Sequence, residues 1–478
     1  MNSKENNQGY GLYFFSILAI LTADICLAND TFPPQTSDVP QPVRRMHYVD
    51  SAYTHPPIPI PVRVASAHNG EQSPDIVIDT GSDSPAAWTV DQAIAATLTA
   101  DPVLRIGIAD ISQAKAELLT RSLLPNPALG IAGSSIPLQR RNADMETDFT
   151  VQLEMPLDWF LFAKRAAEMN SARWEVQQTQ AEYADLVRQR ILETATAFYD
   201  VLEAKALWSI AAHDLRILES VETLTQRAVE TGGAPSVELD RIRVELFRFR
   251  QELLEIESEV HIAKAVLWAQ LGITDRDPAF DVRGSLDAPL TAKPYSIEEA
   301  FEFAKRNRPD IRALRIQVNK AQANQISEKR NAYPEVSLSG GYVKEYLNEG
   351  AEPGWGIGVS ITVPLFDRNQ GGRVKTKAAL RQSNYQLQAG MIELRAEVEK
   401  ADQLFRTAYL KATTFAHEEV RLANRVRDSI IQSYEVGGSP LIDVLDAERT
   451  YRETYRTYIS SRADYWRAKY VYHSVIGQ

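Results

Sequence analysis

The sequence predicts an α+β protein built from two copies of one structural unit. Three observations support this fold class: an internal repeat, four short segments in which apolar and polar residues alternate, and two very long segments almost free of helix-breaking residues. The chain has 478 residues, which is long enough to hold two such units. We therefore expect a duplicated chain in which strands and long helices occur in the same order twice.

The internal repeat begins at Trp88 and continues to the end of the chain. The residues from Trp88 resemble those from Tyr295, an offset of about 207 residues, and a Gly-Gly-X-Pro turn occurs in both halves. We expect a first repeat at 87–290 and a second at 291–478, each with a helix, two strands, a long helix and a last helix. The residues that correspond at this offset are Asp101-Pro102 with Arg308-Pro309, Ala114 with Ala321, and Asn126-Pro127 with Tyr333-Pro334.

The N-terminal segment predicts export from the cytoplasm. Residues 1–28 resemble a secretory signal peptide, with a short apolar run and small residues before a cleavage site after Ala28. Lipidation of Cys26, the one cysteine of the chain, is the alternative. Residues 29–86 are rich in proline, serine and aspartate without amphipathic periodicity, which predicts a flexible segment.

Helices are expected at the start of each repeat and after its strands. The segments 89–124 and 296–332 each predict one helix with a proline inside it. The segment 164–231 contains neither proline nor glycine, and roughly 65 helical residues would extend about 100 Å. The second long helix, 372–436, contains one glycine, Gly390. In the last expected helix, tyrosines recur at steps of seven residues: Tyr451, Tyr458, Tyr465 and Tyr472. This spacing indicates coiled-coil-like packing.

Four segments show the alternation of strands that have one apolar face. They are 127–136, 149–157, 334–343 and 355–365, each about ten residues long, the length of a tilted strand that spans a membrane. Aromatic residues flank these segments, and the polar stretch 344–354 is expected to form the second hairpin loop. In the last strand the apolar face is formed by Trp355, Ile357, Val359, Ile361, Val363 and Leu365.

Three motifs resemble those of a known family. They are 123–127, which leads into the first strand, 364–371, which closes the last strand, and 434–447, which contains the second Gly-Gly turn. Together with the duplication, they resemble the TolC family of outer-membrane efflux channels over both repeats. The first two motifs are most similar to the heavy-metal (cobalt–zinc–cadmium) resistance branch, and the third is shared by the whole family.

The resemblance implies a homotrimer in which each chain gives four strands to one outer-membrane β-barrel and its helices to a periplasmic helical barrel. Four strands cannot close a barrel alone, and lipid does not tolerate open strand edges. The channel would be a passive duct that serves an inner-membrane RND pump through a periplasmic adaptor protein, with heavy-metal cations as cargo. Efflux of drugs or other small molecules, or type I secretion, is the alternative cargo. A periplasmic coiled-coil scaffold without a pore is disfavoured, because a scaffold needs no lipid-facing band.

Acidic residues follow both Gly-Gly turns, which the resemblance places at the periplasmic tip. Asp443 and Asp446, after the second turn, match the family's acidic constriction. Glu238, after the first turn, corresponds to Asp443 by position only. The alternative is that acids in a first helical turn merely stabilise the helix dipole. The candidate gate residues are Asp443, Asp446, Glu238 and Asp240, and the turn glycines are Gly232, Gly233, Gly437 and Gly438.

No pattern predicts catalysis, a cofactor or a protein-bound metal. The tripeptide Asp79-Thr80-Gly81 matches the active-site sequence of aspartic proteases, but that chemistry needs two carboxylates and no second such tripeptide occurs. The stretch His417-Glu418-Glu419 lacks the second histidine of a zinc protease motif. The net charge of −11 argues against nucleic-acid binding, so we expect neither an enzyme nor a nucleic-acid partner.

Overall fold

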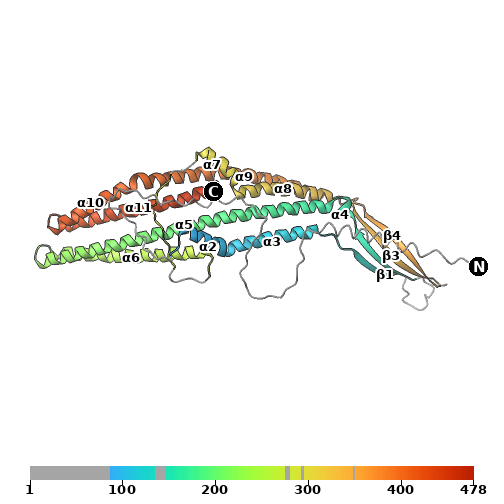
Figure 1. Ribbon diagram of the computed structural model, residues 1–478, viewed down its shortest axis with the longest axis horizontal. Helices are drawn as coiled ribbons and strands as arrows, with labels where there is room; N and C mark the ends of the chain where they lie inside the picture. The colour runs from blue at the N-terminus through green and yellow to red at the C-terminus, as the bar shows by residue number, and fades with distance from the viewer. Residues whose placement is uncertain (1–86, 135–146, 275–279, 292–294, 348–349) are drawn as a thin grey trace, which may run out of the picture. The chain divides into compact units, whose positions relative to one another are not determined.

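The computed structural model describes residues 87–134, 147–274, 280–291, 295–347 and 350–478 (Figure 1). The expected signal peptide, 1–28, and the proline-rich segment, 29–86, lie outside the described residues. Among the described helices, none combines the length and the apolar character needed to cross a lipid bilayer.

Each repeat begins with two helices where the sequence predicts one. The prediction of one continuous helix at 89–124 and at 296–332 was wrong. Proline has no backbone N–H to donate to a helical hydrogen bond, and it keeps the preceding residue out of the helical backbone conformation. Asp101 and Arg308, which precede the two prolines, have ψ angles of 120° and 125°. The four helices are α2 (Val90–Ala100), α3 (Pro102–Ser122), α7 (Ile297–Asn307) and α8 (Pro309–Arg330).

The long helices follow the strands of each repeat. In the first, the short α4 (Asp158–Leu161) leads to α5 (Lys164–Glu230), which has 67 residues, and α6 (Ser236–Leu271) returns beside it (Figure 1). The second long helix continues through Gly390 and is interrupted instead by a π-helical turn. Its parts, followed by the last helix, are α9 (Gln370–Leu410), η2 (Lys411–Phe415), α10 (Ala416–Glu435) and α11 (Leu441–Ile476).

The strands form one antiparallel sheet in chain order, and its central pair, β2 with β3, joins the two repeats. The second hairpin is longer than predicted, because Lys344 pairs with Pro353 and Leu347 with Gly350. The polar side chains of 344–354 predicted a loop, but they did not end the strands, because hydrogen bonds between backbone groups hold an antiparallel pair together. The strands are β1 (Ala128–Ser134), β2 (Thr147–Pro156), β3 (Glu335–Leu347) and β4 (Gly350–Thr362).

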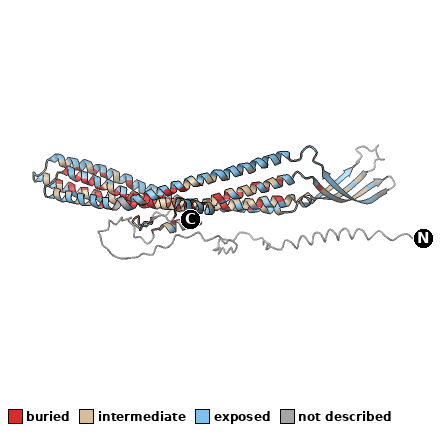
Figure 2. Ribbon diagram, turned by 90° about the horizontal axis from the view of Figure 1, so that it is seen from above, coloured by how far each residue is buried: buried red, intermediate tan, exposed pale blue. Residues whose placement is uncertain are grey.

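The three largest apolar clusters among the described residues hold the helices together. The central cluster includes Phe198, Leu202, Leu267, Val420, Tyr451, Tyr455 and Tyr458. The second-repeat cluster includes Leu394, Val398, Phe405, Tyr465 and Tyr472. The tip cluster includes Leu218, Val221, Ile242, Leu246, Leu441 and Val444. The four tyrosines at seven-residue steps are all buried, which confirms their predicted packing role, and Figure 2 shows buried residues along the helices and mostly exposed ones on the strands.

Candidate functional site

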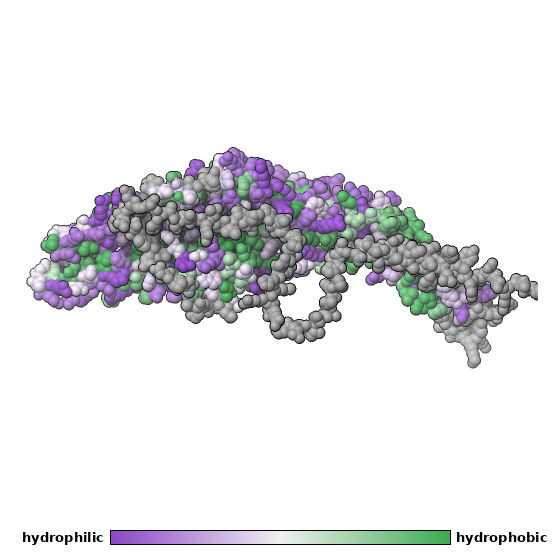
Figure 3. All heavy atoms as spheres, viewed as in Figure 1, coloured by the Kyte–Doolittle hydropathy of each residue, from purple (hydrophilic) through white to green (hydrophobic). Residues whose placement is uncertain are grey.

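One face of the sheet is apolar across its strands. The pairing places Leu129 opposite Leu153 and Tyr342 opposite Trp355, and residues directly opposite each other share a face. Trp355 is 80% exposed and Val359 is 64% exposed. Figure 3 shows hydrophobic atoms over the strands and mostly hydrophilic atoms over the helices. Exposed apolar surface of this extent is typical of a surface that contacts lipid or another protein.

The opposite face of the sheet carries small and polar residues, as the alternation predicts. Here Gln152 pairs with Gly130 on one side and Gly341 on the other. A Cβ atom at Gly341 would lie 2.5 Å from the carbonyl oxygen of Val151, so this position requires glycine. The remaining residues of this face include Thr150, Glu154, Ser337, Ser339, Gly356, Gly358, Ser360 and Thr362.

The two outer strands of the sheet have an unpaired edge. The order β1-β2-β3-β4 leaves β1 and β4 each with one neighbour among the described strands. An open edge presents unpaired backbone donors and acceptors, which lipid does not tolerate. One chain's sheet is therefore incomplete as a membrane-spanning structure.

The Gly-Gly turns lie together at the end of the helices away from the sheet (Figure 1). Gly232 and Gly437 have φ angles of 78° and 76°, a conformation that favours glycine. The amide of Gly233 donates to the carbonyl of Ala228 and that of Gly438 to the carbonyl of Ser433, both at 2.7 Å. This is the glycine-dependent Schellman ending of a helix, so both glycine pairs have a structural role.

The candidate gate acids begin the helices that follow these turns. Asp443 and Asp446 are exposed on α11, whereas Leu441 and Val444 of the same turn are buried in the tip cluster. The two acids therefore project away from the core of their own chain. Asp446 lies 3.5 Å from the guanidinium of Arg449, in an exposed ion pair.

The acids after the first turn differ in exposure. On α6, Asp240 is exposed and Glu238 is half-buried. Near both turns, the hydroxyls of Thr225 on α5 and Tyr434 on α10 are 2.7 Å apart. The two helical hairpins, α5–α6 and α10–α11, thus meet near the candidate gate residues.

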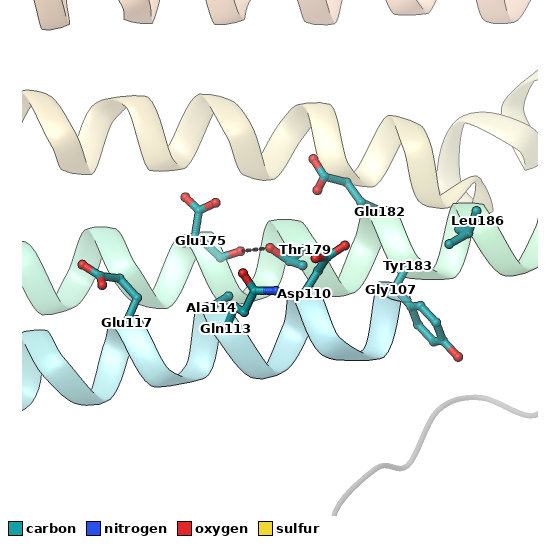
Figure 4. Close-up of a pocket in the computed structure, with 10 residues that line it drawn as sticks. All are labelled: Gly107, Asp110, Gln113, Ala114, Glu117, Glu175, Thr179, Glu182, Tyr183 and Leu186. Atoms are coloured by element: carbon teal, nitrogen blue, oxygen red, sulfur yellow. Dashed lines mark hydrogen bonds between the residues drawn. The ribbon is translucent and has the colours of Figure 1, made fainter. Parts of the chain in front are cut away.

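A hollow of about 660 Å³ between α3 and α5 is lined by four acidic residues (Figure 4). Three of them have partners: Glu117 pairs with Arg121, Glu175 with Lys320, and Glu182 accepts a hydrogen bond from the amide of Gln178; the fourth is Asp110. In Figure 4 the carboxylates of the three glutamates lie apart along the two helices. Within the part of the chain that the structure describes, no three potential ligands gather into a metal site.

Sequence reasoning missed two fully buried acids, Asp214 on α5 and Glu448 on α11. The signal that would have found them is their spacing. Asp214 lies four residues before the core residue Leu218, and Glu448 lies three residues before Tyr451. Such spacing places a residue on the core-facing side of a helix.

Comparison with known proteins supports the same assignment as the geometry. The family model for outer membrane efflux proteins matches residues 94–272 and 301–469, one segment in each repeat. The cobalt-zinc-cadmium resistance protein CzcC of Cupriavidus metallidurans is 24% identical over 395 residues, which are 82% of this chain and 90% of that protein. The nickel-cobalt-cadmium resistance protein NccC of Alcaligenes xylosoxydans xylosoxydans is 24% identical over 269 residues, 56% of this chain and 57% of that protein.

The fold also matches a solved structure of CusC, which was reported in connection with transmembrane channel formation. The TM-score is 0.69 at 18% identity, over 87% of this chain and 99% of that one. The described fold, mostly helical with one four-stranded antiparallel sheet, is therefore the fold of TolC-like channels. The chain belongs to the outer membrane efflux protein family, and it is a non-enzymatic outer-membrane channel of a tripartite efflux system, with a periplasmic helical extension.

Proposed function

We propose that three copies of this chain form one passive export duct, in which three four-stranded sheets close a single barrel. The observation that carries this proposal is the combination of an apolar outer face with unpaired edges on β1 and β4. Pairing β1 of one copy with β4 of the next satisfies both edges and leaves the polar face toward the lumen.

The assembly can be tested by light scattering on detergent-solubilised protein. The mass, corrected for detergent, is expected near that of three chains. A chain that remains monomeric and soluble after the detergent has been removed would contradict the proposal, because its apolar band would then need no lipid.

We propose that heavy-metal cations are the cargo, delivered by an inner-membrane RND pump through a periplasmic adaptor. The support is the similarity to CzcC and NccC, whose names state resistance to cobalt, cadmium, zinc or nickel, and the motifs at 123–127 and 364–371. The competing proposal is that the same channel serves efflux of drugs or other small molecules, or type I secretion.

The cargo can be tested by deleting the gene in its host and measuring growth on zinc, cobalt and cadmium salts. We expect sensitivity to at least one of these metals with unchanged sensitivity to dyes and antibiotics. The reverse pattern would assign the channel to drug efflux and would remove the metal proposal.

We propose that Asp443 and Asp446 form the periplasmic gate, with Glu238 and Asp240 nearby. If three chains meet at the turns, each position gives a ring of three carboxylates, and such rings select cations. Carboxylates a few ångströms apart repel by several kcal/mol even at an effective dielectric constant near 20, so closure needs helix packing or bound cations to offset the repulsion.

Planar-bilayer conductance tests the gate. We expect Asp443→Asn with Asp446→Asn to lower cation preference and to weaken block by trivalent ions. Asp464→Asn, an exposed acid farther along α11, is the matched control and should leave both unchanged. If the double variant also keeps wild-type selectivity and block, the tip acids are helix-start residues only.

A further inference from the structure

A buried polar layer separates the tip cluster from the central cluster. We define the layer as Asp214 of α5, Arg427 of α10 and Glu448 of α11. On α11, Val444 before the layer belongs to the tip cluster, and Tyr451 after it belongs to the central cluster. Charged groups therefore interrupt an otherwise apolar interface between the α5–α6 hairpin and the α10–α11 hairpin.

The two acids of the layer are buried without hydrogen bonds. Asp214 is 0% exposed and Glu448 is 1% exposed. None of their four carboxylate oxygens has a hydrogen-bond partner among the described residues. A buried ionised carboxylate is costly unless it is both paired and hydrogen-bonded, so these two groups are poorly placed to carry full negative charge.

Arg427 is the one cation inside the layer, and it is shared. Its Nε lies 3.8 Å from Glu448 Oε1, beyond hydrogen-bond distance. Its Nη2 donates to Asn424 at 2.7 Å and to Asp428 at 3.0 Å, and its guanidinium carbon lies 3.9 Å from the centre of the Tyr451 ring. Other groups thus engage Arg427 through Nε and Nη2, while its buried Nη1 has no hydrogen-bond partner among the described residues, and one cation cannot neutralise both buried acids.

Charged and titratable groups face the pair from each of the four helices. On α6, Glu252 lies 3.4 Å from Arg452 of α11. Burial lowers the pKa of His213 on α5, and Arg427 acts on it in the same direction. The full set around the pair is His213 of α5, Glu252 of α6, Arg427 and Asp428 of α10, and Tyr451 and Arg452 of α11.

Burial favours the protonated form of both acids. It raises the pKa of Asp214 to about 6 and that of Glu448 to about 7, although Arg427 and Arg452 act in the opposite direction. The negative charge of Asp214 also raises the pKa of Glu448, and that of Glu252 raises the pKa of Asp214. The pair therefore changes charge between mildly acidic and mildly alkaline conditions.

We propose that Asp214 and Glu448 form a proton-binding pair whose charge sets how tightly the α5–α6 hairpin packs against the α10–α11 hairpin. Protonated, the pair fits a closed interface. Ionised, the two carboxylates repel each other and draw water into the layer, which separates the hairpins and moves their Gly-Gly turns apart. The separation of the hairpins stands without the proposed channel function. A change of ion conductance caused by that separation rests on the proposed gate at the turns.

Distances between spin labels on the two hairpins test the proposal directly. The labels are placed at the exposed Gln226 of α5 and Gln432 of α10, as cysteines in a Cys26→Ser background, with labelled chains diluted by unlabelled ones. We expect longer distances at about pH 8 than at about pH 5, values that lie above and below both pKa values.

The variant Asp214→Asn with Glu448→Gln keeps the shape of both side chains without the charge. It should hold the short distances at both pH values, whereas Glu453→Gln, an exposed acid on α11, should respond like wild type. Distances that do not change with pH in the wild type, or that still change in the double variant, would overturn the proposal.

Infrared spectroscopy of the wild type gives a measurement that needs no folded variant. We expect the carbonyl stretching band of a protonated carboxyl at about pH 6, lost on raising the pH to about 8. Absence of that band would also overturn the proposal. If the distances respond to pH but bilayer conductance does not, the proton-binding pair stands and the proposed gate at the turns fails.

Discussion

Leu338 of β3 lies directly opposite Val359 of β4, and both belong to the apolar face of the sheet. The next residue of β4, Ser360, lies opposite Ser337 on the other face. Two adjacent positions of one strand therefore report on the two environments separately, at almost the same depth in the membrane.

Val359→Arg is expected to impair membrane insertion, because it places a charge near the middle of the apolar run from Trp355 to Leu365. The cost is about 2–4 kcal/mol at the bilayer midplane. Ser360→Arg, which faces the lumen, should be milder. Folding into lipid vesicles, followed by urea titration, measures both variants, and equal losses would show that the faces are wrongly assigned.

Asp101→Ala is expected to destabilise the start of the first repeat by about 2 kcal/mol. The buried carboxylate accepts a hydrogen bond from the amide of Val103 at 2.9 Å and pairs with Arg190 at 2.6 Å, so the change removes a helix cap and leaves the partly buried Arg190 to its more exposed partner, Glu193. The matched control is Glu117→Ala, whose ion pair with Arg121 is exposed and contributes under about 1 kcal/mol. Denaturant unfolding in detergent compares the two, and a similar loss from both would be inconsistent with this account.

Gly437→Ala is expected to destabilise the second tip turn by roughly 1–2 kcal/mol. Space is not the reason, since a Cβ atom there meets no atom within 4 Å; the φ angle of 76° is what an alanine resists. Gly371→Ala, where a Cβ is equally unobstructed and φ is ordinary, should be neutral or slightly stabilising. Hydrogen exchange of the amides around each turn distinguishes the two outcomes, and a Gly437→Ala protein with unchanged exchange would contradict the strain argument.

The stability of the helical hairpins is expected to fall as the pH rises from about 4 to above 7. The folded-state pKa values of Asp214 and Glu448, about 6 and about 7, exceed the ordinary values of 3.8 and 4.5, so the folded state binds protons more tightly. The contribution of each acid, on the order of 3 kcal/mol, is fully present below its ordinary pKa and is lost as the pH rises through its folded-state pKa. Unfolding midpoints of wild type and Glu448→Gln across this range provide the check, and a flatter profile is expected for the variant.

Local patterns predicted the elements that depend on one kind of force. Alternation in β4 correctly predicted that Trp355, Ile357 and Val359 share one face, because successive side chains of a strand point to opposite faces of the sheet. The seven-residue steps correctly predicted the buried face of α11, because packing against neighbouring helices acts on residues one heptad apart. The ends of elements were less predictable: Pro102 and Pro309 divided helices that periodicity alone joins.

The buried acids were not predictable from composition, because long helices carry many acids on their solvent face. Asp214 and Glu448 differ from the solvent-exposed acids only because they lie on the same helix face as the core residues. Whether the two acids lie near each other depends on how α5 packs against α11. The tip acids show the opposite case. Asp443 was found through its motif, while its role depends on neighbouring chains, which no single sequence places.

The π-helical turn η2 divides the long helix of the second repeat, whereas its counterpart α5 is continuous. Such a turn holds one extra residue, and each residue advances a helix by about 100°, so side chains of α10 are rotated relative to a continuation of α9. Phe405 before the turn packs in the second-repeat cluster, and Val420 after it packs in the central cluster. The second long helix therefore serves two clusters in turn with two differently oriented faces, while α11 packs along both of its parts.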